Sequence, residues 1–188
     1  MKIAVISDIH ENRRNLQMAL NEIEERGIEQ IICLGDFINP GIARVLADSK
    51  IPVFAIWGNN DGDVAKILNI ASGEGSNLKM SENTFDKLEL GGKKIFITHY
   101  EDFAESIAKS GDYDAVFYGH THNKDKKNIG NCLLLNPGEL STHKTGIASY
   151  AIYDTETNNA EIFDLENSFN TKWEDVDYNE KGRFVGKK

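Results

Sequence analysis

Cysteine is scarce in this chain of 188 residues, and its few thiols follow no metal or redox pattern. Cys33 and Cys132 each lie inside an apolar run, where a free thiol behaves as a small buried hydrophobe. Neither belongs to a C-x-x-C motif, which makes a disulfide or a cysteine metal site the weaker alternative. We therefore expect a reduced protein with a cytoplasmic location.

Long hydrophobic runs are also missing. No window approaches the roughly 18 consecutive apolar residues that a membrane span needs. The opening sequence MKIAVISDIH reaches an aspartate and a histidine too early for a signal peptide. Hydrophobic residues make up 40% of the chain and charged residues 27%, which is typical of globular proteins. We expect a soluble, unexported protein without a membrane partner.

Positive charge is in short supply, because 21 Lys and Arg residues face 30 Asp and Glu residues for a net charge of −9. Binding a nucleic-acid polymer needs clustered Lys and Arg, and the short stretch 124–127 is too small to supply them. The chain also lacks a G-x-S-x-G motif and any reactive-cysteine pattern, so no covalent nucleophile is indicated. A small anionic substrate fits only if the site brings its own positive charge.

Apolar periodicity predicts three β-α units in the first half of the chain. Strands are expected at 2–7, 31–34 and 52–57, and each is followed by an amphipathic helical stripe. The first stripe, from Leu16 to Ile23, ends at Gly27. The other two run from Ile42 to Leu46 and from Val64 to Leu68. Repeated β-α units favour a mostly parallel sheet with helices on its faces.

The second half is richer in strands. Hairpins are predicted at 83–98 around Gly91-Gly92, at 126–136 and at 147–166, with a short helix at 103–109 and a strand at 115–119 between them. The fold class is therefore α/β, as a four-layer α/β/β/α sandwich of two mixed sheets flanked by helices. We expect one domain over residues 1–166 and a C-terminal extension over 167–188, docked or flexible.

Potential metal ligands stand where the predicted strands end, and carboxyl ends of strands are where open α/β sheets bind ligands. A lone aspartate at such a place is more often a cap or turn residue, and a lone histidine is more often simply hydrogen-bonded. Those roles do not explain the same placement at five strand ends. Mixed oxygen and imidazole donors suit Mn, Fe, Ni or Zn better than Mg or Ca. The residues are Asp8, His10, Asp36, Asn59, His99, His120 and His122.

These residues fall in ordered motifs that resemble a known family. D-I-H at 8–10, G-D at 35–36, G-N-N-D at 58–61, T-H at 98–99 and G-H-T-H at 119–122 resemble the calcineurin-like metallophosphoesterase superfamily. Order and spacing look most like its small prokaryotic YfcE-type phosphodiesterases. The likeness covers roughly the first 140 residues, including N-P-G at 136–138.

The resemblance implies two divalent ions, with Mn²⁺ expected and Ni²⁺, Fe²⁺ or Zn²⁺ as alternatives. One ion takes Asp8, His10 and His122, the other takes Asn59, His99 and His120, and Asp36 bridges the two. We expect Asp36, Asn59 and His99 to take part in catalysis as well. Two metals about 3.5–4 Å apart lower the pKa of a bridging water, and the resulting hydroxide attacks the phosphate ester in line.

One position departs from the wider superfamily. Many members read G-N-H-D/E, with a histidine thought to protonate the leaving oxygen, whereas this chain has Asn60, which has no acidic proton to donate. YfcE-type members also lack that histidine. We therefore hypothesise a preference for esters whose leaving group departs with little protonation, such as aryl phosphodiesters. Asn12 and Asn60 are the residues expected to contact the substrate.

Other polar residues near the motifs are weaker candidates for the site. Cap, turn and exposed-surface roles account for them at least as well. They are Arg13, Arg14, His143 and Lys144, together with Asp61, for which the alternative is to orient the loop of Asn59. Tyr100 stands where members of the family that the motifs resemble often carry a glycine, and one interpretation of this difference places it at the mouth of the site.

Two rival functions stay open. A phosphomonoesterase or nucleotidase would share the metal core and differ only in its pocket walls. A protein-binding scaffold of the same fold, such as the retromer subunit of this superfamily, is the alternative from another class. Scaffolds tend to lose ligand histidines, and this chain keeps all of them.

Overall fold

The computed structural model of the protein describes residues 1–166, 168, 176–178 and 184–187. Two large sheets form most of it, in the strand orders β11-β10-β1-β2-β3-β4 and β5-β6-β7-β9-β8. The first sheet contains β1 (Lys2–Ile6), β2 (Gln30–Cys33), β3 (Val53–Ala55), β4 (Leu78–Met80), β10 (Ser149–Asp154) and β11 (Asn159–Asp164). The second contains β5 (Phe85–Leu90), β6 (Lys93–Thr98), β7 (Ala115–Tyr118), β8 (Lys124–Ile129) and β9 (Cys132–Pro137).

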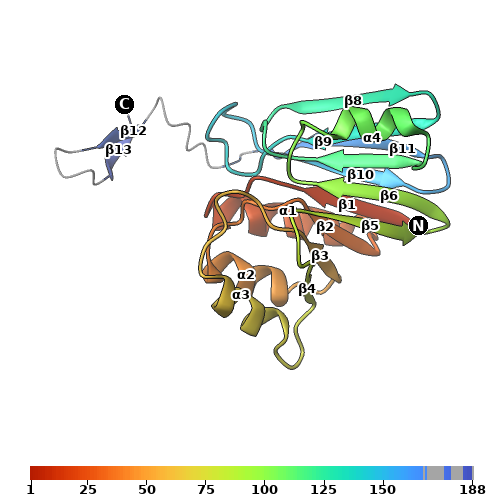
Figure 1. Cartoon of the computed structure of the whole chain (residues 1–188). Coiled ribbons are helices and arrows are strands. Elements are labelled where there is room, and N and C mark those ends of the chain that lie inside the picture. Colours follow the sequence, from red (N-terminus) through yellow and green to blue (C-terminus); the bar gives the residue numbers. More distant parts are fainter. Residues whose placement is uncertain (167, 169–175, 179–183, 188) are drawn as a thin grey trace.

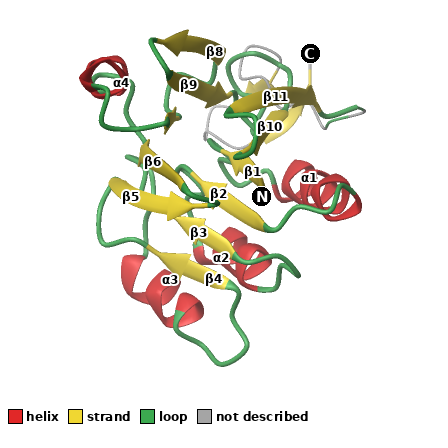
Figure 2. Ribbon diagram, turned by 90° about the vertical axis from the view of Figure 1, so that its right-hand side faces the viewer, coloured by secondary structure: helices red, strands yellow, loops and turns green. Residues whose placement is uncertain are grey.

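Both sheets are mixed. In the first, β1 pairs parallel with β2 and antiparallel with β10. In the second, β6 pairs parallel with β7 and antiparallel with β5. The helices are α1 (Arg13–Glu25), α2 (Pro40–Ala47), α3 (Val64–Ala71) and α4 (Ala104–Ser110). Figure 2 shows α1, α2 and α3 along the strands of the first sheet, with α4 beyond the second.

Alternating side chains along β1 divide the interior into layers. Ala4 and Ile6 belong to the apolar cluster shared with the first three helices, whereas Ile3 and Val5 belong to the cluster between the two sheets. A third cluster, which includes Phe96, joins the second sheet to α4. Successive residues of a strand point to opposite faces, so one buried strand contributes to two cores. The predicted four-layer sandwich is confirmed (Figure 1).

Most predicted elements are present within a few residues of their expected ends. Asn12 caps the first helix, because its side-chain oxygen accepts a hydrogen bond from the backbone of Asn15 (3.1 Å). Gly27 lies just after the helix with φ of +67°. Strand β4, which pairs parallel with β3, was not predicted. At three residues it is too short to show a period of two.

The predicted extension at 167–188 lies mostly outside the described residues. Within it, β12 (Val176–Tyr178) and β13 (Phe184–Lys187) pair antiparallel. Among the residues that the structure describes, no helix is both long enough and apolar enough to cross a bilayer.

Candidate metal centre

The seven predicted ligands follow five strands whose ends lie at one edge of the two sheets. In the first sheet, Asp8 and His10 follow β1, Asp36 follows β2 and Asn59 follows β3. In the second sheet, His99 comes directly after β6, and His120 and His122 follow β7. Backbone hydrogen bonds tie these loops together: the amides of Ile9 and His10 both donate to the carbonyl of Asp36 at 3.0 Å. The ends of parallel strands thus bring together residues that are far apart in the sequence.

Most of the predicted ligands have left-handed backbone conformations. A non-glycine residue in that region is uncommon and costs about 1–3 kcal/mol, so it persists only where the surrounding structure enforces it. The strain therefore coincides with the candidate site. The residues are Asp8 (φ 52°), His10 (φ 41°), Asp36 (φ 54°), His120 (φ 65°) and His122 (φ 65°).

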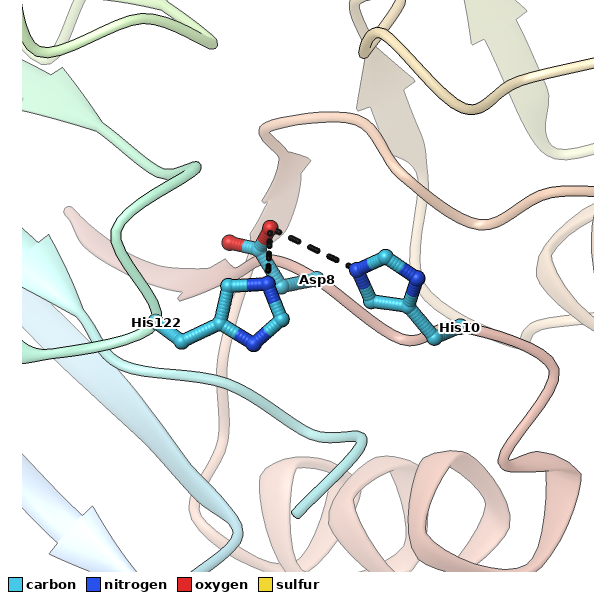
Figure 3. Close-up of side chains that lie close together, drawn as sticks. All are labelled: Asp8, His10 and His122. Atoms are coloured by element: carbon cyan, nitrogen blue, oxygen red, sulfur yellow. Dashed lines mark ion pairs between the residues drawn. The ribbon is translucent and has the colours of Figure 1, made fainter. Parts of the chain in front are cut away.

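One half of the site consists of Asp8, His10 and His122 (Figure 3). The Oδ1 atom of Asp8 lies 3.4 Å from Nε2 of His122 and 3.9 Å from Nε2 of His10. The rings of the two histidines lie side by side, with centroids 4.9 Å apart. Three donor atoms thus face one small volume.

The other half is arranged around His99. Its Nε2 atom lies 2.9 Å from Oδ1 of Asn59 and 3.6 Å from Oδ1 of Asp36. The ring of His120 packs edge-on against it at 5.1 Å between centroids.

Asp36 lies between the two halves and is almost fully buried. Its Oδ2 atom is 3.4 Å from Nε2 of His10, and its Oδ1 atom is 3.6 Å from Nε2 of His99. The two oxygens of one carboxylate therefore face different histidines, which is the arrangement that a bridging ligand needs.

Two observations indicate that a cation fits here. Oδ1 of Asp8 is buried and has no hydrogen-bond donor among the described residues, and an unsatisfied buried carboxylate oxygen is costly. In addition, Nδ1 of His99 lies 2.7 Å from the carbonyl oxygen of Leu34, which can only accept a hydrogen bond. That contact assigns the ring proton to Nδ1 and leaves Nε2 as an acceptor facing the Asn59 oxygen. Nε2 of His99 and Oδ1 of Asn59 are then two acceptor atoms only 2.9 Å apart. A positive ion would interact favourably with this pair and with the unsatisfied oxygen of Asp8.

The electrostatics of the first half favour ligation too. Burial lowers the pKa of His10 to about 4, although the neighbouring Asp36 carboxylate acts in the opposite direction. The ring is therefore neutral at pH 7, which is the form that binds metals. Burial also raises the pKa of Asp8, against the influence of His122 and His99, so keeping its carboxylate ionised has an energetic cost that a cation would offset.

Asn60 contacts Asp36 twice. Its backbone amide donates to Oδ1 at 2.8 Å, and its side-chain amide donates to Oδ2 at 2.7 Å. Asn12 is buried, caps α1 and donates to the carbonyl of Ser141 at 3.1 Å. Both amides thus have partners within the protein, and their contact with substrate stays a prediction.

Asp61 orients the loops that carry Asp36 and Asn59. Its carboxylate accepts hydrogen bonds from the backbone amides of Asp36 (3.0 Å), Ile38 (2.7 Å) and Gly58 (2.7 Å). The residue that precedes α3 is Asp63, so Asp61 is a loop anchor rather than the helix cap.

The weaker candidates divide into two groups. Arg13 and Arg14 are exposed at the start of α1. The ring of His143 lies 5.3 Å from that of His10, and the ring of Tyr100 packs edge-on against His99 at 5.2 Å. His143 and Tyr100 therefore border the candidate ligands, as one reading of the sequence predicted.

Glu139 is a residue that the sequence did not reveal. It follows the N-P-G motif, is fully buried, and places Oε2 2.6 Å from Nδ1 of His122. A glutamate in a polar loop has no periodicity and no motif of its own, so its contact with the candidate ligand His122, 17 positions away, becomes visible only in three dimensions.

Comparison with known proteins agrees with this geometry. Residues 1–158 match the family described as the calcineurin-like phosphoesterase superfamily domain. Phosphodiesterase MJ0936 of Methanocaldococcus jannaschii is 33% identical over 158 residues, which are 83% of this chain and 94% of that protein.

Solved structures give the same result for the fold. An archaeal phosphodiesterase superimposes with a TM-score of 0.78 at 32% identity, over 88% of this chain and 100% of that one. The phosphoesterase Yfce from E. coli superimposes with a TM-score of 0.70 at 23% identity, over 91% of this chain and 97% of that one. At that lower identity the likeness concerns the fold alone.

Proposed function

The chain belongs to the calcineurin-like phosphoesterase superfamily, and on this premise we propose that it is a dinuclear metal-dependent phosphodiesterase that hydrolyses small phosphate esters. The observation that carries the proposal is the position of Asp36. Its two carboxylate oxygens face His10 and His99, which belong to the two halves of the site. A carboxylate placed in this way suits a pair of ions better than a single one.

In the proposed arrangement one ion is held by Asp8, His10 and His122. The other ion is held by Asn59, His99 and His120, and Asp36 contacts both. The unsatisfied oxygen of Asp8 and the acceptor pair of His99 and Asn59 support these assignments. The mixture of oxygen and nitrogen donors supports Mn²⁺, with Ni²⁺, Fe²⁺ and Zn²⁺ as alternatives.

The charge of the site favours an anionic substrate. Two divalent ions bring four positive charges, and only Asp8 and Asp36 among the proposed ligands bring negative charge, so the centre is net positive within a protein of net charge −9. When bound, such ions activate water and stabilise phosphoryl oxygens. The protein's part is to hold neutral imidazoles and two carboxylates in place, with Asn60 fixing the orientation of Asp36.

One feature supports a diester rather than a monoester as substrate: a relative that is 33% identical over most of its length is named a phosphodiesterase. A second feature concerns the leaving group. Position 60, where an acid for the leaving oxygen would otherwise stand, carries an amide that is committed to Asp36, which supports esters with good leaving groups such as aryl esters. Two free, buried cysteines agree with the cytoplasm as the proposed location.

The test is hydrolysis of a bis-aryl phosphate and of an aryl monophosphate by chelator-stripped protein, with Mn²⁺, Ni²⁺, Zn²⁺ and Mg²⁺ returned one at a time. We expect the stripped protein to be inactive, a transition metal to restore activity, and the diester to react faster. Full activity after complete stripping would contradict the proposal. Faster hydrolysis of the monoester would favour a phosphomonoesterase instead.

Substitution of the bridging residue supplies a second arm of the test. Asp36→Asn removes the charge between the two halves while keeping the size of the side chain, and we expect a loss of at least about 100-fold in kcat together with weaker metal binding. Asp86→Asn, on the edge strand β5, is the matched control and should behave as the parent protein. Equal rates for the Asp36 variant and the parent would refute the bridging role.

A further inference from the structure

Glu139 has more hydrogen bonds than a residue in an ordinary surface loop requires. The side chain is fully buried, and its carboxylate accepts hydrogen bonds from the candidate metal centre and from the loop at 139–147. Donors to its two oxygens are Nδ1 of His122, the hydroxyls of Ser141 and Thr145, and the backbone amides of His143, Lys144 and Thr145. A buried carboxylate is stable only when its charge is satisfied in this way.

The contact with His122 determines which nitrogen of that ring faces the site. Nδ1 of His122 lies 2.6 Å from Oε2 of Glu139, so Nδ1 carries the ring proton and donates a hydrogen bond to that oxygen. Nε2 is then left with its lone pair, 3.4 Å from Oδ1 of Asp8. Although burial alone would raise the pKa of Glu139, hydrogen bonds from His122, Ser141 and Thr145 hold it at about 2. The carboxylate is therefore ionised at neutral pH.

The other contacts hold the loop. Consecutive backbone amides of His143 (2.9 Å), Lys144 (3.0 Å) and Thr145 (2.7 Å) converge on the same carboxylate, forming a small nest around a negative charge. This conformation positions two side chains at the centre. The ring of His143 lies 5.3 Å from that of His10, and Nζ of Lys144 lies 3.4 Å from the carbonyl oxygen of His120.

We propose that Glu139 is a positioning residue that links one half of the metal centre to the loop at 139–147, so that occupancy of that half and order of the loop depend on each other. The inference rests on the proposed dinuclear function, and it adds a residue that acts only through His122 and the loop amides. The link is asymmetric, because Nδ1 of His99 in the other half contacts the backbone carbonyl of Leu34 instead.

Glu139→Gln tests the link because the amide keeps the size of the side chain but removes the charge. Partners of ligating histidines typically contribute 10–100-fold to metal affinity. We expect Mn²⁺ titration of the stripped, full-length protein to show the affinity of one site, that of Asp8, His10 and His122, lowered by that factor. The affinity of the other site should change by less than about threefold. Glu22→Gln, which alters a carboxylate that accepts from the hydroxyl of Tyr150 (2.9 Å), is the matched control and should bind as the parent protein.

Hydrogen exchange of the metal-free and Mn²⁺-loaded proteins gives a second measurement. In the parent, Mn²⁺ should slow exchange of the amides of residues 143–145. In Glu139→Gln these amides should exchange faster, and Mn²⁺ should protect them less. Unchanged metal affinity together with unchanged exchange would overturn the proposal, and so would an equal loss at both metal sites.

Thr145→Val covers the case in which Glu139→Gln does not fold. It removes one hydroxyl donor to Glu139 and leaves the contact with His122 in place. We expect faster exchange at 143–145 and a smaller loss of affinity at the same single site, and the absence of both effects would count against the link. If the parent itself binds none of Mn²⁺, Ni²⁺, Fe²⁺ and Zn²⁺, the proposed function fails, whereas a parent with two sites and a Glu139→Gln variant that matches it overturn only the role of Glu139.

Discussion

Asn60 donates hydrogen bonds to both carboxylate oxygens of Asp36. The backbone amide donates to one oxygen and the side-chain amide to the other, at 2.8 and 2.7 Å. Asp36 is the residue that faces both halves of the candidate metal centre. Asn60, which stands where many members of the superfamily are thought to carry an acid for the leaving oxygen, therefore orients the carboxylate that we propose as the bridge between two ions.

Asn60→His should change the dependence of the rate on the leaving group. An imidazole can donate an acidic proton, which an amide lacks, so we expect esters with poor alkyl leaving groups to gain relative to aryl esters. The measurement is kcat/KM for a series of phosphodiesters whose leaving groups differ in pKa, and we expect a shallower slope for the variant.

Asn60→Ala is the control for this comparison. It removes the side-chain contact with Asp36 without adding an acid, so it should lower rates across the whole series while leaving the slope unchanged. The leaving-group hypothesis would be abandoned if Asn60→His left both rate and slope as they are in the parent.

Gly58→Ala should disrupt the site. A Cβ at this position would collide with Oδ1 and the backbone nitrogen of Asp36, so both the carboxylate and the backbone of Asp36 would have to shift. We expect at least a tenfold weaker affinity for Mn²⁺ and a comparable loss of kcat, measured by calorimetric titration and steady-state kinetics.

Gly62→Ala is a matched control in the same loop. A Cβ there would lie 3.7 Å from the carbonyl oxygen of Ile38, which is ordinary contact distance. It should bind metal as the parent does. Parent-like metal binding by the Gly58 variant would show that the close approach to Asp36 has no influence on the ligand.

Much of this structure was accessible from the sequence, because the strands that precede the candidate ligands are buried apolar runs that stop abruptly at polar residues. Side-chain periodicity identified the strands ending before Asp8, Asp36 and Asn59, and the family resemblance connected them with the histidines. The four-layer arrangement and the family are confirmed.

What the sequence did not reveal depends on contacts between distant segments. Strand β4 has three residues and pairs with β3 at the edge of the first sheet, and three residues are too few for local periodicity to indicate a strand. Glu139 anchors a loop through backbone amides, and any polar residue could make such contacts until the fold defines which amides are near. For Asp61 the sequence left a loop-orienting role and a cap role open, and the three amides that donate to it favour the first. Asp and His adopt left-handed conformations more readily than most residues, but only the closure of these loops determines that Asp8 and His122 do so here.

Phe117→Ala should destabilise the interface between the two sheets. The side chain is fully buried, belongs to the cluster between the sheets, and packs edge-on against Tyr153 at 5.2 Å. Truncating a buried phenylalanine costs about 3–5 kcal/mol of unfolding free energy. Urea denaturation of the metal-free protein measures the change, and Phe103→Ala, at a side chain that is 63% exposed, should stay within about 0.5 kcal/mol of the parent.

Removing metal should lower thermal stability, and returning Mn²⁺ should restore it. The metal-free site keeps a buried Asp8 whose pKa is raised by burial and whose Oδ1 atom has no hydrogen-bond donor among the described residues. Ions that bind only the folded state stabilise it by about 2.7 kcal/mol at a free concentration 100 times the dissociation constant. We therefore expect Tm to fall after chelation and to rise with Mn²⁺ concentration.

The rise should be much smaller in Asp36→Asn, which lacks the charge of the proposed bridge. An identical Tm with and without chelator would mean that these side chains do not hold a metal ion.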